Sequence, residues 1–319
     1  MTTRLAVVGA GVMGANHIRV AKSQPAVELV AIVDGDMQRA EAARGDDSEI
    51  RCLATVDELI DLGLAEAVIV AVPTPFHHEV VSKTLDAGIH TLVEKPIAGN
   101  LEEADDLIRR AEVAGVVLMV GHVERFNPVI MEMVNYIDQA IHIEADRVGP
   151  FSARVKDSVV LDLMIHDVDI VRMLAGSDVV DVTGVARSVK SPEIDLASVH
   201  LVFANGVTAT LTASRLGQQK VRQIRVTTND SYVIADLLRQ DISINRVQHV
   251  EFVAEGGARY RQTGMVEVPF IENRGEPLAL ELREFLGAIA EDRAPAVDGA
   301  AGRAALELVG RIHEVVRGV

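Results

Sequence analysis

The sequence has one cysteine, no tryptophan and few other aromatic side chains. Cys52 alone cannot form an internal disulfide and is too little for a cysteine-rich metal site. We therefore expect a protein of the reducing cytoplasm without a bound metal ion. Three tyrosines and seven phenylalanines among 319 residues leave few aromatic surfaces on which bases or sugars could stack.

Long apolar runs are also missing, since no stretch approaches the roughly 18 residues that a membrane-spanning helix needs. The opening residues 1–4 lead directly into a short apolar segment and lack the pattern of a signal peptide. The formal net charge of −16 argues against a general surface for nucleic acid or anionic membranes. We expect neither as a partner, although a local basic pocket for a phosphorylated small molecule stays compatible with this charge.

What the chain does contain is enough apolar sequence, 49%, for sizeable cores, and its length favours two domains. Short apolar runs alternate with helical segments in the first 121 residues, which predicts a parallel sheet covered on both faces. The expected strands are Leu5–Val8, Glu28–Asp34, Ala67–Val72, Thr91–Glu94 and Val116–Val120. The expected helices are Val12–Ser23, Met37–Arg44, Val56–Leu62, Glu79–Ala87 and Leu101–Ala114.

The pattern changes after Gly121. A helical stretch at Val129–Gln139 is followed by strand-like runs with alternating apolar and polar residues and only short turns between them. These runs are Asp178–Ser188, Ala197–Phe203, Val207–Ser214, Val221–Thr227 and Tyr232–Asp236. They predict a mostly antiparallel sheet with one exposed face, and Asn205-Gly206 is typical of a hairpin turn. We expect a dinucleotide-binding domain over residues 1–121 and a second domain over 122–319, which ends in helices at Pro277–Asp292 and Gly299–Arg317.

A glycine-rich turn follows the first expected strand. Gly9-Ala10-Gly11-Val12-Met13-Gly14 matches the G-x-G-x-x-G pattern of a dinucleotide phosphate cradle. Asp34 stands 20 residues after Gly14, at the end of the second strand, where a carboxylate binds the adenosine ribose hydroxyls. Because that carboxylate would repel a 2′-phosphate, we predict NAD rather than NADP, a preference that the nearby Arg39 weakens.

Two further turns lie at strand ends on the same expected edge of the sheet, where ligands of parallel sheets bind. Glu94-Lys95-Pro96 places two charged residues there, and the proline favours an extended Lys95. Either this is a surface ion pair, or Lys95 serves the cofactor site. The second turn, residues 72–79 with Pro73, Thr74 and His77, can pack against the nicotinamide half of the cofactor, or its histidines can be ordinary helix-start residues.

The segment Leu161–Leu174 is expected to form a helix on which Asp162, His166 and Asp169 fall on one stripe among apolar neighbours. Asp162 could orient His166 as a general base. A solvated helix face is the main alternative. Metal binding is disfavoured because no further ligand cluster is evident.

Taken together, these motifs resemble the glucose–fructose oxidoreductase / inositol dehydrogenase (Gfo/Idh/MocA) family over nearly the whole chain. The resemblance implies a Rossmann domain followed by an α/β domain with a large open, mostly antiparallel sheet that often forms oligomers. It implies a dehydrogenase of a sugar or polyol, with Lys95, Asp162 and His166 at the catalytic positions. Glu94 and His77 would lie beside the nicotinamide ribose.

A narrower resemblance, to dehydrogenases that oxidise the 3-hydroxyl of UDP-N-acetylglucosamine, rests on residues 121–128, 147–151 and 162–167. It implies a sugar-nucleotide substrate bound by polar and cationic side chains, for which the candidates are Arg125, Asn127, Arg147, Arg154, Lys156 and Asp169. The sequence departs from many family members at Val159, Val160 and Met164, where glycines are common, and these bulkier side chains could narrow the sugar pocket.

The resemblance leads to one expected function and two alternatives. The expected function is NAD-dependent hydride transfer between nicotinamide and a sugar hydroxyl, by a homodimer or homotetramer assembled through the second sheet. A dehydrogenase of a free polyol or sugar is an alternative within the same chemistry. A non-catalytic NAD- or sugar-sensing binder is an alternative of another class, disfavoured by the presence of the three catalytic residue types.

Overall fold

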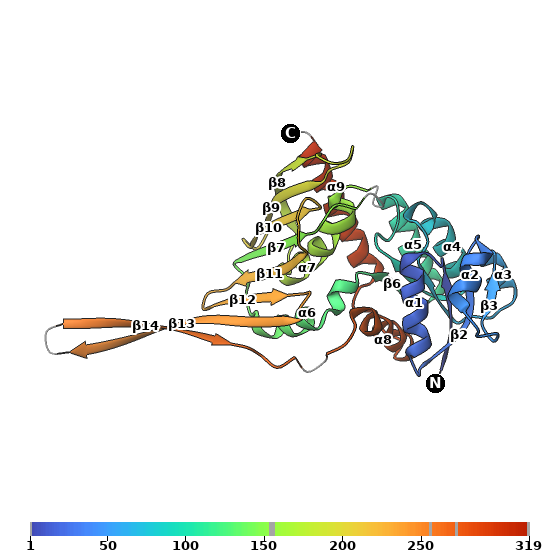
Figure 1. The fold of residues 1–319 in the computed structure, drawn as a ribbon, viewed down its shortest axis with the longest axis horizontal. Helices are drawn as coiled ribbons and strands as arrows, with labels where there is room; N and C mark the ends of the chain where they lie inside the picture. Colours follow the sequence, from blue (N-terminus) through green and yellow to red (C-terminus); the bar gives the residue numbers. More distant parts are fainter. Residues whose placement is uncertain (1, 153–156, 255–256, 272–273, 318–319) are drawn as a thin grey trace. The chain divides into compact units, whose positions relative to one another are not determined.

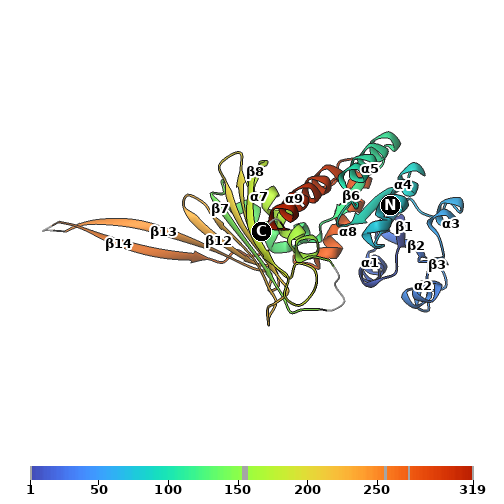
Figure 2. The same ribbon diagram turned by 90° about the horizontal axis from the view of Figure 1, so that it is seen from above.

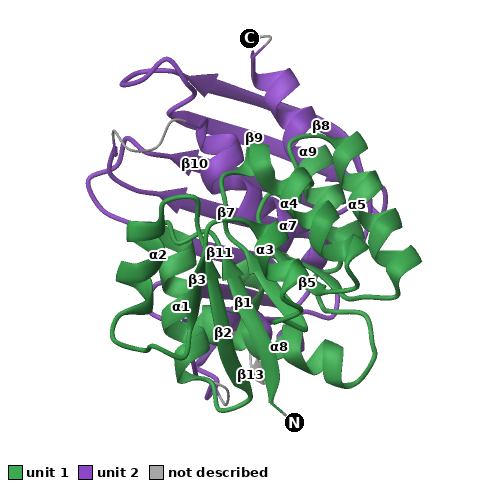
Figure 3. Ribbon diagram, turned by 90° about the vertical axis from the view of Figure 1, so that its right-hand side faces the viewer, with its two compact units in different colours: residues 1–126, 276–307 green, residues 127–275, 308–319 purple. Residues whose placement is uncertain are grey.

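The structure is a computed structural model that describes residues 2–152, 157–254, 257–271 and 274–317. The chain divides into two compact units, shown in two colours in Figure 3. Unit 1 comprises residues 1–126 and 276–307, and unit 2 comprises residues 127–275 and 308–319. Each unit is built around one sheet.

The sheet of unit 1 has six parallel strands in its described residues, in the order β3-β2-β1-β4-β5-β6. Its strands are β1 (Thr3–Val8), β2 (Val27–Val33), β3 (Arg51–Leu53), β4 (Ala67–Val70), β5 (His90–Glu94) and β6 (Leu118–Gly121). Its helices are α1 (Val12–Ser23), α2 (Met37–Arg44), α3 (Val56–Asp61), α4 (His77–Asp86), α5 (Leu101–Ala114) and α8 (Pro277–Ala290). The strand order reverses between β1 and β4, so the carboxyl ends of these two strands flank a crevice where dinucleotides bind in such sheets. The prediction of a doubly wound parallel sheet is confirmed.

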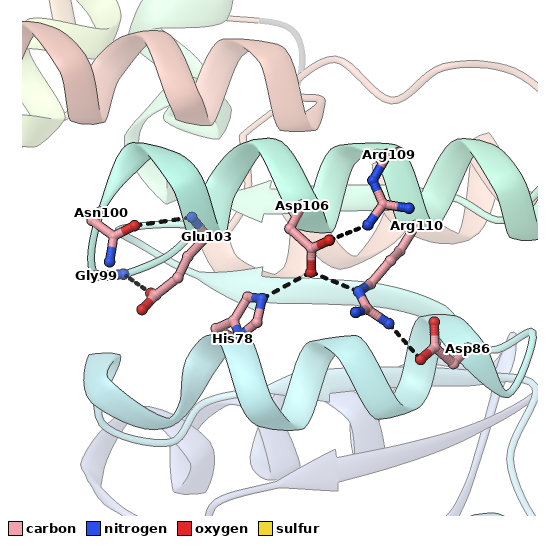
Figure 4. Close-up of polar contacts among 8 residues, drawn as sticks. All are labelled: His78, Asp86, Gly99, Asn100, Glu103, Asp106, Arg109 and Arg110. Atoms are coloured by element: carbon pink, nitrogen blue, oxygen red, sulfur yellow. Dashed lines mark hydrogen bonds and ion pairs between the residues drawn. The ribbon is translucent and has the colours of Figure 1, made fainter.

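Local sequence signals explain where these helices begin and end. The Thr55 side chain accepts a hydrogen bond from the Glu58 backbone at 3.3 Å and caps α3. The Asn100 side chain does the same for Glu103 at 2.9 Å at the start of α5 (Figure 4). Gly115, in the left-handed conformation, ends α5.

Helices α4 and α5 are joined by a charged network centred on Asp106 (Figure 4). The Asp106 carboxylate accepts hydrogen bonds from His78 Nε2 at 2.9 Å, from Arg110 Nε at 2.7 Å and from Arg109. Arg110 also contacts Asp86 at 2.6 Å. These donors hold the pKa of Asp106 well below its usual range, Arg110 contributing most. The network therefore ties together two helices that cover one part of the sheet.

Unit 2 contains an eight-stranded sheet in the described residues, in the order β14-β13-β12-β11-β7-β10-β9-β8. All neighbours are antiparallel except β7 and β10, which are parallel. The strands are β7 (His142–Val148), β8 (Val179–Arg187), β9 (Leu196–Phe203), β10 (Thr208–Ser214), β11 (Val221–Thr227), β12 (Ser231–Asp236), β13 (Asp241–Ala254) and β14 (Gly257–Glu267). Asn205-Gly206 lies in the β9–β10 hairpin, as predicted, with Gly206 at φ 88°. Strands β13 and β14 form a long hairpin that extends beyond β12 (Figures 1 and 2).

The two faces of this sheet differ in chemistry. Helix α7 (Ile165–Ala175) contacts β7 and β10, and α6 (Pro128–Met133) contacts β12 and β13. The opposite face carries half-buried polar side chains, including Arg225 in ion pairs with Asp146 and, at 3.4 Å, with Glu144. The alternating pattern in the sequence thus reflects one apolar and one polar face, as predicted.

Two helical segments differ from the sequence expectation. The stretch Val129–Gln139 is helical only to Met133, followed by a 3₁₀ turn at Val134–Tyr136. The expected single helix at Leu161–Leu174 begins instead with a π-helical turn, Val160–Met164, before α7 starts at Ile165. Such turns are common at functional sites.

The division into units also differs from the expected boundary after residue 121. Residues 276–307 belong to unit 1, because α8 packs against α1 and the 3₁₀ turn Val123–Phe126. Arg19 of α1 forms a bidentate ion pair with Glu276, and Arg283 of α8 contacts Gln24 at 3.2 Å. Helix α9 (Gly299–Arg317) has residues in both units.

Candidate functional site

Unit 1 contains a cavity of about 780 Å³ at the carboxyl ends of its central strands. The glycine-rich turn, Asp34, the Pro73–His77 segment and Glu94-Lys95 all line it. Its cofactor candidates are Gly9, Gly11, Val12, Met13, Asp34, Pro73, Thr74, His77, Glu94 and Lys95. The structure therefore gathers in one cavity residues that the sequence placed on separate turns.

The three glycines have different geometric roles. A side chain on Gly9, at φ 95°, would lie 2.6 Å from the Ala71 carbonyl oxygen, and one on Gly14 would lie 1.7 Å from the Gly9 carbonyl oxygen. A side chain on Gly11 would meet nothing within 4 Å and would point into open space. Gly9 and Gly14 thus permit the tight turn and the close helix packing, whereas Gly11 leaves room for a ligand.

The start of α1 is suited to an anion. Gly11 is the N-cap residue and offers no side-chain hydrogen bond to the first turn, which contains no acidic residue. The free N–H groups and the helix dipole there favour phosphate. Val12, 82% exposed, presents apolar surface beside them. These features fit the pyrophosphate and flanking rings of a dinucleotide.

Asp34 immediately follows β2 and is bound to the cradle itself. Its carboxylate accepts hydrogen bonds from the backbone N–H of Ala10 at 2.7 Å and of Asp36 at 2.8 Å. Arg39 lies 3.6 Å from the same carboxylate and 3.1 Å from Asp36. Asp34 therefore holds the glycine turn and balances a nearby cation.

Strand β5 ends at Glu94, Lys95 follows it directly, and the peptide bond between Lys95 and Pro96 is cis. Glu94 is 7% exposed, and its carboxylate contacts His17 Nε2 at 2.7 Å. This buried contact fixes Glu94 at the wall of the cavity. His17 follows the glycine turn in sequence, and its role was not evident from the pattern.

His77 connects the two turns that the sequence singled out. Its ring nitrogens lie 2.8 Å from the Pro96 carbonyl oxygen and 2.9 Å from the Val72 carbonyl oxygen. Burial lowers the pKa of His77, which favours the neutral ring with a single N–H donor. His77 lines the cavity, and its single N–H can donate to one of these two carbonyl oxygens.

Unit 2 contains a second cavity of about 250 Å³ beside the π-helical turn. It is lined by Arg147, Val148, Gly149, Pro150, Phe151, Ser152, Asp162, Leu163, Arg215, Lys220 and Arg222. Of the predicted site residues, Asp162 and Arg147 meet here. Arg215, Lys220 and Arg222 were not identified from the sequence, because isolated cations on strands and loops give no motif.

Arg147 is held by a buried ion pair. Its guanidinium donates to Asp167 from Nη2 at 2.8 Å and from Nε at 2.9 and 3.1 Å, and both residues are at most 3% exposed. Asp167 lies on α7, next to His166 in sequence. The pair thus anchors the helix that carries His166 to β7.

The polar stripe of the Asp162 segment is only partly exposed. Asp162 and His166 are half-buried, and Asp169 is 1% exposed, so this face is not fully solvated. Val159, Val160 and Met164 are completely buried in the structure. Their side chains do not line the unit 2 cavity.

The remaining substrate candidates are dispersed. Arg125 is half-buried in the 3₁₀ turn Val123–Phe126. Asn127 is buried, caps α6 and donates to the Leu237 carbonyl oxygen at 3.1 Å. Arg154 and Lys156 lie outside the described residues. Among the residues that are described, no group of three His, Cys, Asp or Glu side chains is placed to hold a metal ion.

The parallel sheet with its glycine cradle defines a dinucleotide-binding protein, and comparison with known proteins specifies the class. Residues 3–122 match a family model described as an oxidoreductase family with an NAD-binding Rossmann fold, and residues 138–232 match the GFO/IDH/MocA C-terminal domain. In the described part of the chain, no helix is long and apolar enough to cross a membrane.

Relatives match along almost the entire chain. A UDP-N-acetylglucosamine 3-dehydrogenase of Acidithiobacillus ferrooxidans is 33% identical over 95% of this chain and 94% of its own length. A scyllo-inositol 2-dehydrogenase of Bacillus subtilis is 28% identical over 92% and 88%. A solved structure of UDP-N-acetylglucosamine 3-dehydrogenase from A. ferrooxidans superimposes with a TM-score of 0.88 at 30% identity, covering 100% of this chain and 98% of that one. The chain belongs to the Gfo/Idh/MocA family of NAD-binding oxidoreductases.

Proposed function

We propose that this protein is an NAD-dependent dehydrogenase that oxidises the 3-hydroxyl of a UDP-N-acetylhexosamine. The observation that carries the proposal is that the glycine cradle and Lys95 line the same cavity in unit 1. A lysine at the cofactor cavity is suited to redox chemistry on a bound alcohol, whereas a simple sensor has no need of it. The relationship to a UDP-N-acetylglucosamine 3-dehydrogenase over nearly the full length supports the substrate class.

NAD is the proposed cofactor rather than NADP. The Asp34 carboxylate lines the cavity beside the cradle and is suited to accept hydrogen bonds from ribose hydroxyls. Arg39 is paired with Asp34 and Asp36. These two carboxylates compensate its charge, which weakens the attraction of Arg39 for the 2′-phosphate of NADP.

The proposed roles of the protein's own residues follow acid–base chemistry. His166 accepts the hydroxyl proton, and Asp162 orients the ring and stabilises its protonated form. Lys95 donates a hydrogen bond to the substrate oxygen as negative charge develops there. When bound, the nicotinamide supplies the hydride acceptor, so the carbinol loses one hydride and one proton and becomes a ketone.

Lys95→Met and His166→Asn should each lower kcat by on the order of a thousandfold with little change in NAD affinity. Lys22→Met, on an exposed surface outside the cavity, is the matched control for Lys95→Met. NADH formation would be followed at saturating NAD, and NAD affinity by fluorescence titration. Near-wild-type turnover in either site variant would remove that residue from the mechanism.

A free polyol is the second candidate substrate, favoured by the relationship to the scyllo-inositol dehydrogenase. NADH formation with UDP-N-acetylglucosamine, myo- and scyllo-inositol and glucose, each at the same concentration, separates the two. Turnover only with the inositols would replace the proposed substrate. NAD binding without turnover on any of them would favour the sensing binder.

We further propose a homodimer or homotetramer assembled through the polar face of the unit 2 sheet. The charged and hydroxyl groups there are only partly exposed, and they include Arg225, Glu144 and Tyr232, whose hydroxyl contacts Glu144 at 3.1 Å. Light scattering would give the mass in solution, and a monomer at micromolar concentration would contradict the assembly.

A further inference from the structure

Glu281 of α8 is a carboxyl group that is completely buried in unit 1. Among the described residues, none forms a hydrogen bond with either oxygen of its side chain. A buried carboxylate normally has a cation or several N–H groups around it, because an isolated charge in the interior costs far more free energy than a neutral acid. This environment therefore favours the neutral, protonated form of Glu281.

Helix α8 packs on α1 and on the 3₁₀ turn Val123–Phe126. The titratable and charged groups on these elements, directly beside the turn and on α8 itself are His17, Arg19, Lys22, His122, Glu124, Arg125, Arg283 and Glu284. The outer ones have partners of their own, since Arg19 bonds to Glu276 and Glu284 bonds to Arg293.

The pKa of Glu281 reflects these surroundings. Burial raises the pKa of Glu281 well above its usual range, and the negative charge of Glu94 raises it further. Both effects disfavour the ionised acid. An apolar side chain would fill this position without the cost of burying a carboxyl group, so the presence of an acid here indicates a use for its proton.

Glu94 connects the buried acid to the cofactor cavity. It lines that cavity, it contacts His17, and its Oε2 accepts a hydrogen bond from the Lys95 backbone N–H at 3.3 Å. Gly121 of β6 packs against it, because a side chain on Gly121 would lie 3.4 Å from the same oxygen. A charge that a ligand places beside Glu94 therefore acts on Glu281 through a poorly screened interior.

We propose that Glu281 is a positioning residue that acts on the cofactor through Glu94. It holds its proton in the cofactor-free protein, and it gives up this proton more readily when the positively charged nicotinamide of NAD⁺ lies at Glu94 than when neutral NADH is bound. The proton passes to the solvent, and no other bond forms or breaks. The inference rests on the proposed function, which puts the nicotinamide beside Lys95, for the ligand but not for the buried acid.

The linked proton makes the choice between the two forms of the cofactor depend on pH. Because NAD⁺ and NADH differ by one charge at the nicotinamide, rising pH should favour NAD⁺ as Glu281 ionises. We expect the ratio of the Kd for NADH to the Kd for NAD⁺ to rise on the order of fivefold between pH 6 and pH 9 through this residue. One linked proton limits the change to about tenfold per pH unit.

Calorimetry of NAD⁺ and NADH binding from pH 6 to pH 9 tests this link. Glu281→Gln keeps the shape and neutrality of the protonated acid but cannot titrate, so the pH dependence of the ratio should be about fivefold smaller than in the wild type. Other groups at the cavity contribute equally to both proteins. Glu112→Gln, which changes an exposed carboxylate of α5 outside the cavity, is the matched control and should behave as the wild type. The same pH dependence in wild type and Glu281→Gln would overturn the inference.

Urea unfolding of the cofactor-free protein tests the buried acid by itself. The folded-state pKa of Glu281 is raised, so the stability that its proton provides is complete below the unfolded value of about 4.3 and is lost as pH rises towards the folded value. The urea midpoint of Glu281→Gln should therefore rise relative to that of the wild type, by up to roughly 0.4 M per pH unit.

The two measurements distinguish this inference from the proposed function. A difference in midpoint that does not change with pH would show that Glu281 keeps no raised pKa, and the inference would be wrong. If the difference follows pH but neither NAD⁺ nor NADH binds, the buried acid stands, whereas the proposed function and the link to the cofactor are wrong.

Discussion

The three glycines of the cradle have different surroundings, and each therefore has a different role. The spacing of Gly9, Gly11 and Gly14 was evident from the sequence, and so was the acid 20 residues later. Their separate roles were not, because a pattern does not show what lies around each α-carbon. Only the structure shows that Gly14 packs on the Gly9 carbonyl while Gly11 borders open space.

This difference predicts two distinct defects. Gly11→Ala should leave the melting temperature within about 1 °C of wild type but raise the Kd for NAD at least tenfold, since its methyl group occupies the space left for phosphate. Gly14→Ala should lower stability by several kcal/mol, because its methyl group would collide with backbone. Thermal unfolding and NAD titration of both variants check this. Equal stability loss in both would contradict the assignment.

Asp34 is the residue on which cofactor choice should depend. Asp34→Ala removes the acceptor for the Ala10 N–H and one of the two carboxylates that pair with Arg39, the other being Asp36. We expect weaker NAD binding, by on the order of tenfold, and a smaller preference for NAD over NADP. Ratios of kcat/KM for the two cofactors measure this, with Asp46→Ala, an exposed carboxylate outside the cavity, as control. An unchanged ratio in Asp34→Ala would show that Asp34 supports the loop without selecting the cofactor.

Arg147 marks the limit of residue-level prediction. The sequence indicated a substrate-binding cation, and the structure shows a guanidinium held by Asp167 at the edge of a cavity. Its partner, Asp167, is 20 residues away in the sequence. In that segment the sequence indicated Asp162 and Asp169 as functional acids, but not Asp167. Pairing of this kind depends on how α7 packs against β7, which the sequence does not specify.

At the scale of elements, regular patterns were predicted well and irregular ones poorly. Helices α1, α2, α5 and α9 have the predicted bounds, because caps and glycines mark their ends. Strand β3 was not predicted, because it has only three residues at the edge of the sheet and too few apolar residues to show a strand pattern. Strands β7, β13 and β14 were missed because polar and charged residues interrupt them. The π-helical turn before α7 has no sequence signature and displaced the expected helix start.

The Asp106 network predicts a pH-dependent contact between α4 and α5. Asp106→Asn should lower the free energy of unfolding by about 1–2 kcal/mol at pH 7, since His78, Arg109 and Arg110 lose a shared acceptor. The folded-state pKa of Asp106 is depressed, so its contribution is complete above the unfolded value of about 3.9 and is lost as pH falls through the folded value.

Urea unfolding of wild type and Asp106→Asn between pH 7 and pH 3 measures this effect. The difference between them should be constant at neutral pH and shrink below about pH 4. Glu112→Gln removes a charge on the same helix, outside the network, and should change stability by less than about 0.5 kcal/mol. A difference that does not depend on pH would assign the effect to packing.

The whole molecule combines two units whose boundaries are not contiguous in sequence. Two domains were predicted from the change of pattern near residue 121, but the return of residues 276–307 to unit 1 was not. Apolar periodicity predicts that α8 is a helix without indicating which sheet it covers. Its ion pair between Glu276 and Arg19 joins residues that are 257 positions apart, and no local pattern indicates such a contact.

Two cavities in two units predict that two ligands protect different parts of the chain. NAD at about a hundred times its Kd should stabilise unit 1 by about 2.7 kcal/mol, which slows exchange of amides that open with that unit about a hundredfold. Hydrogen exchange with mass spectrometry should then show the largest protection by NAD in β1 and β4. UDP-N-acetylglucosamine, the proposed substrate, should protect β7 and β11, whose residues line the unit 2 cavity. Equal protection of both sheets by NAD alone would contradict this prediction, because it would show that the two units open as one cooperative body.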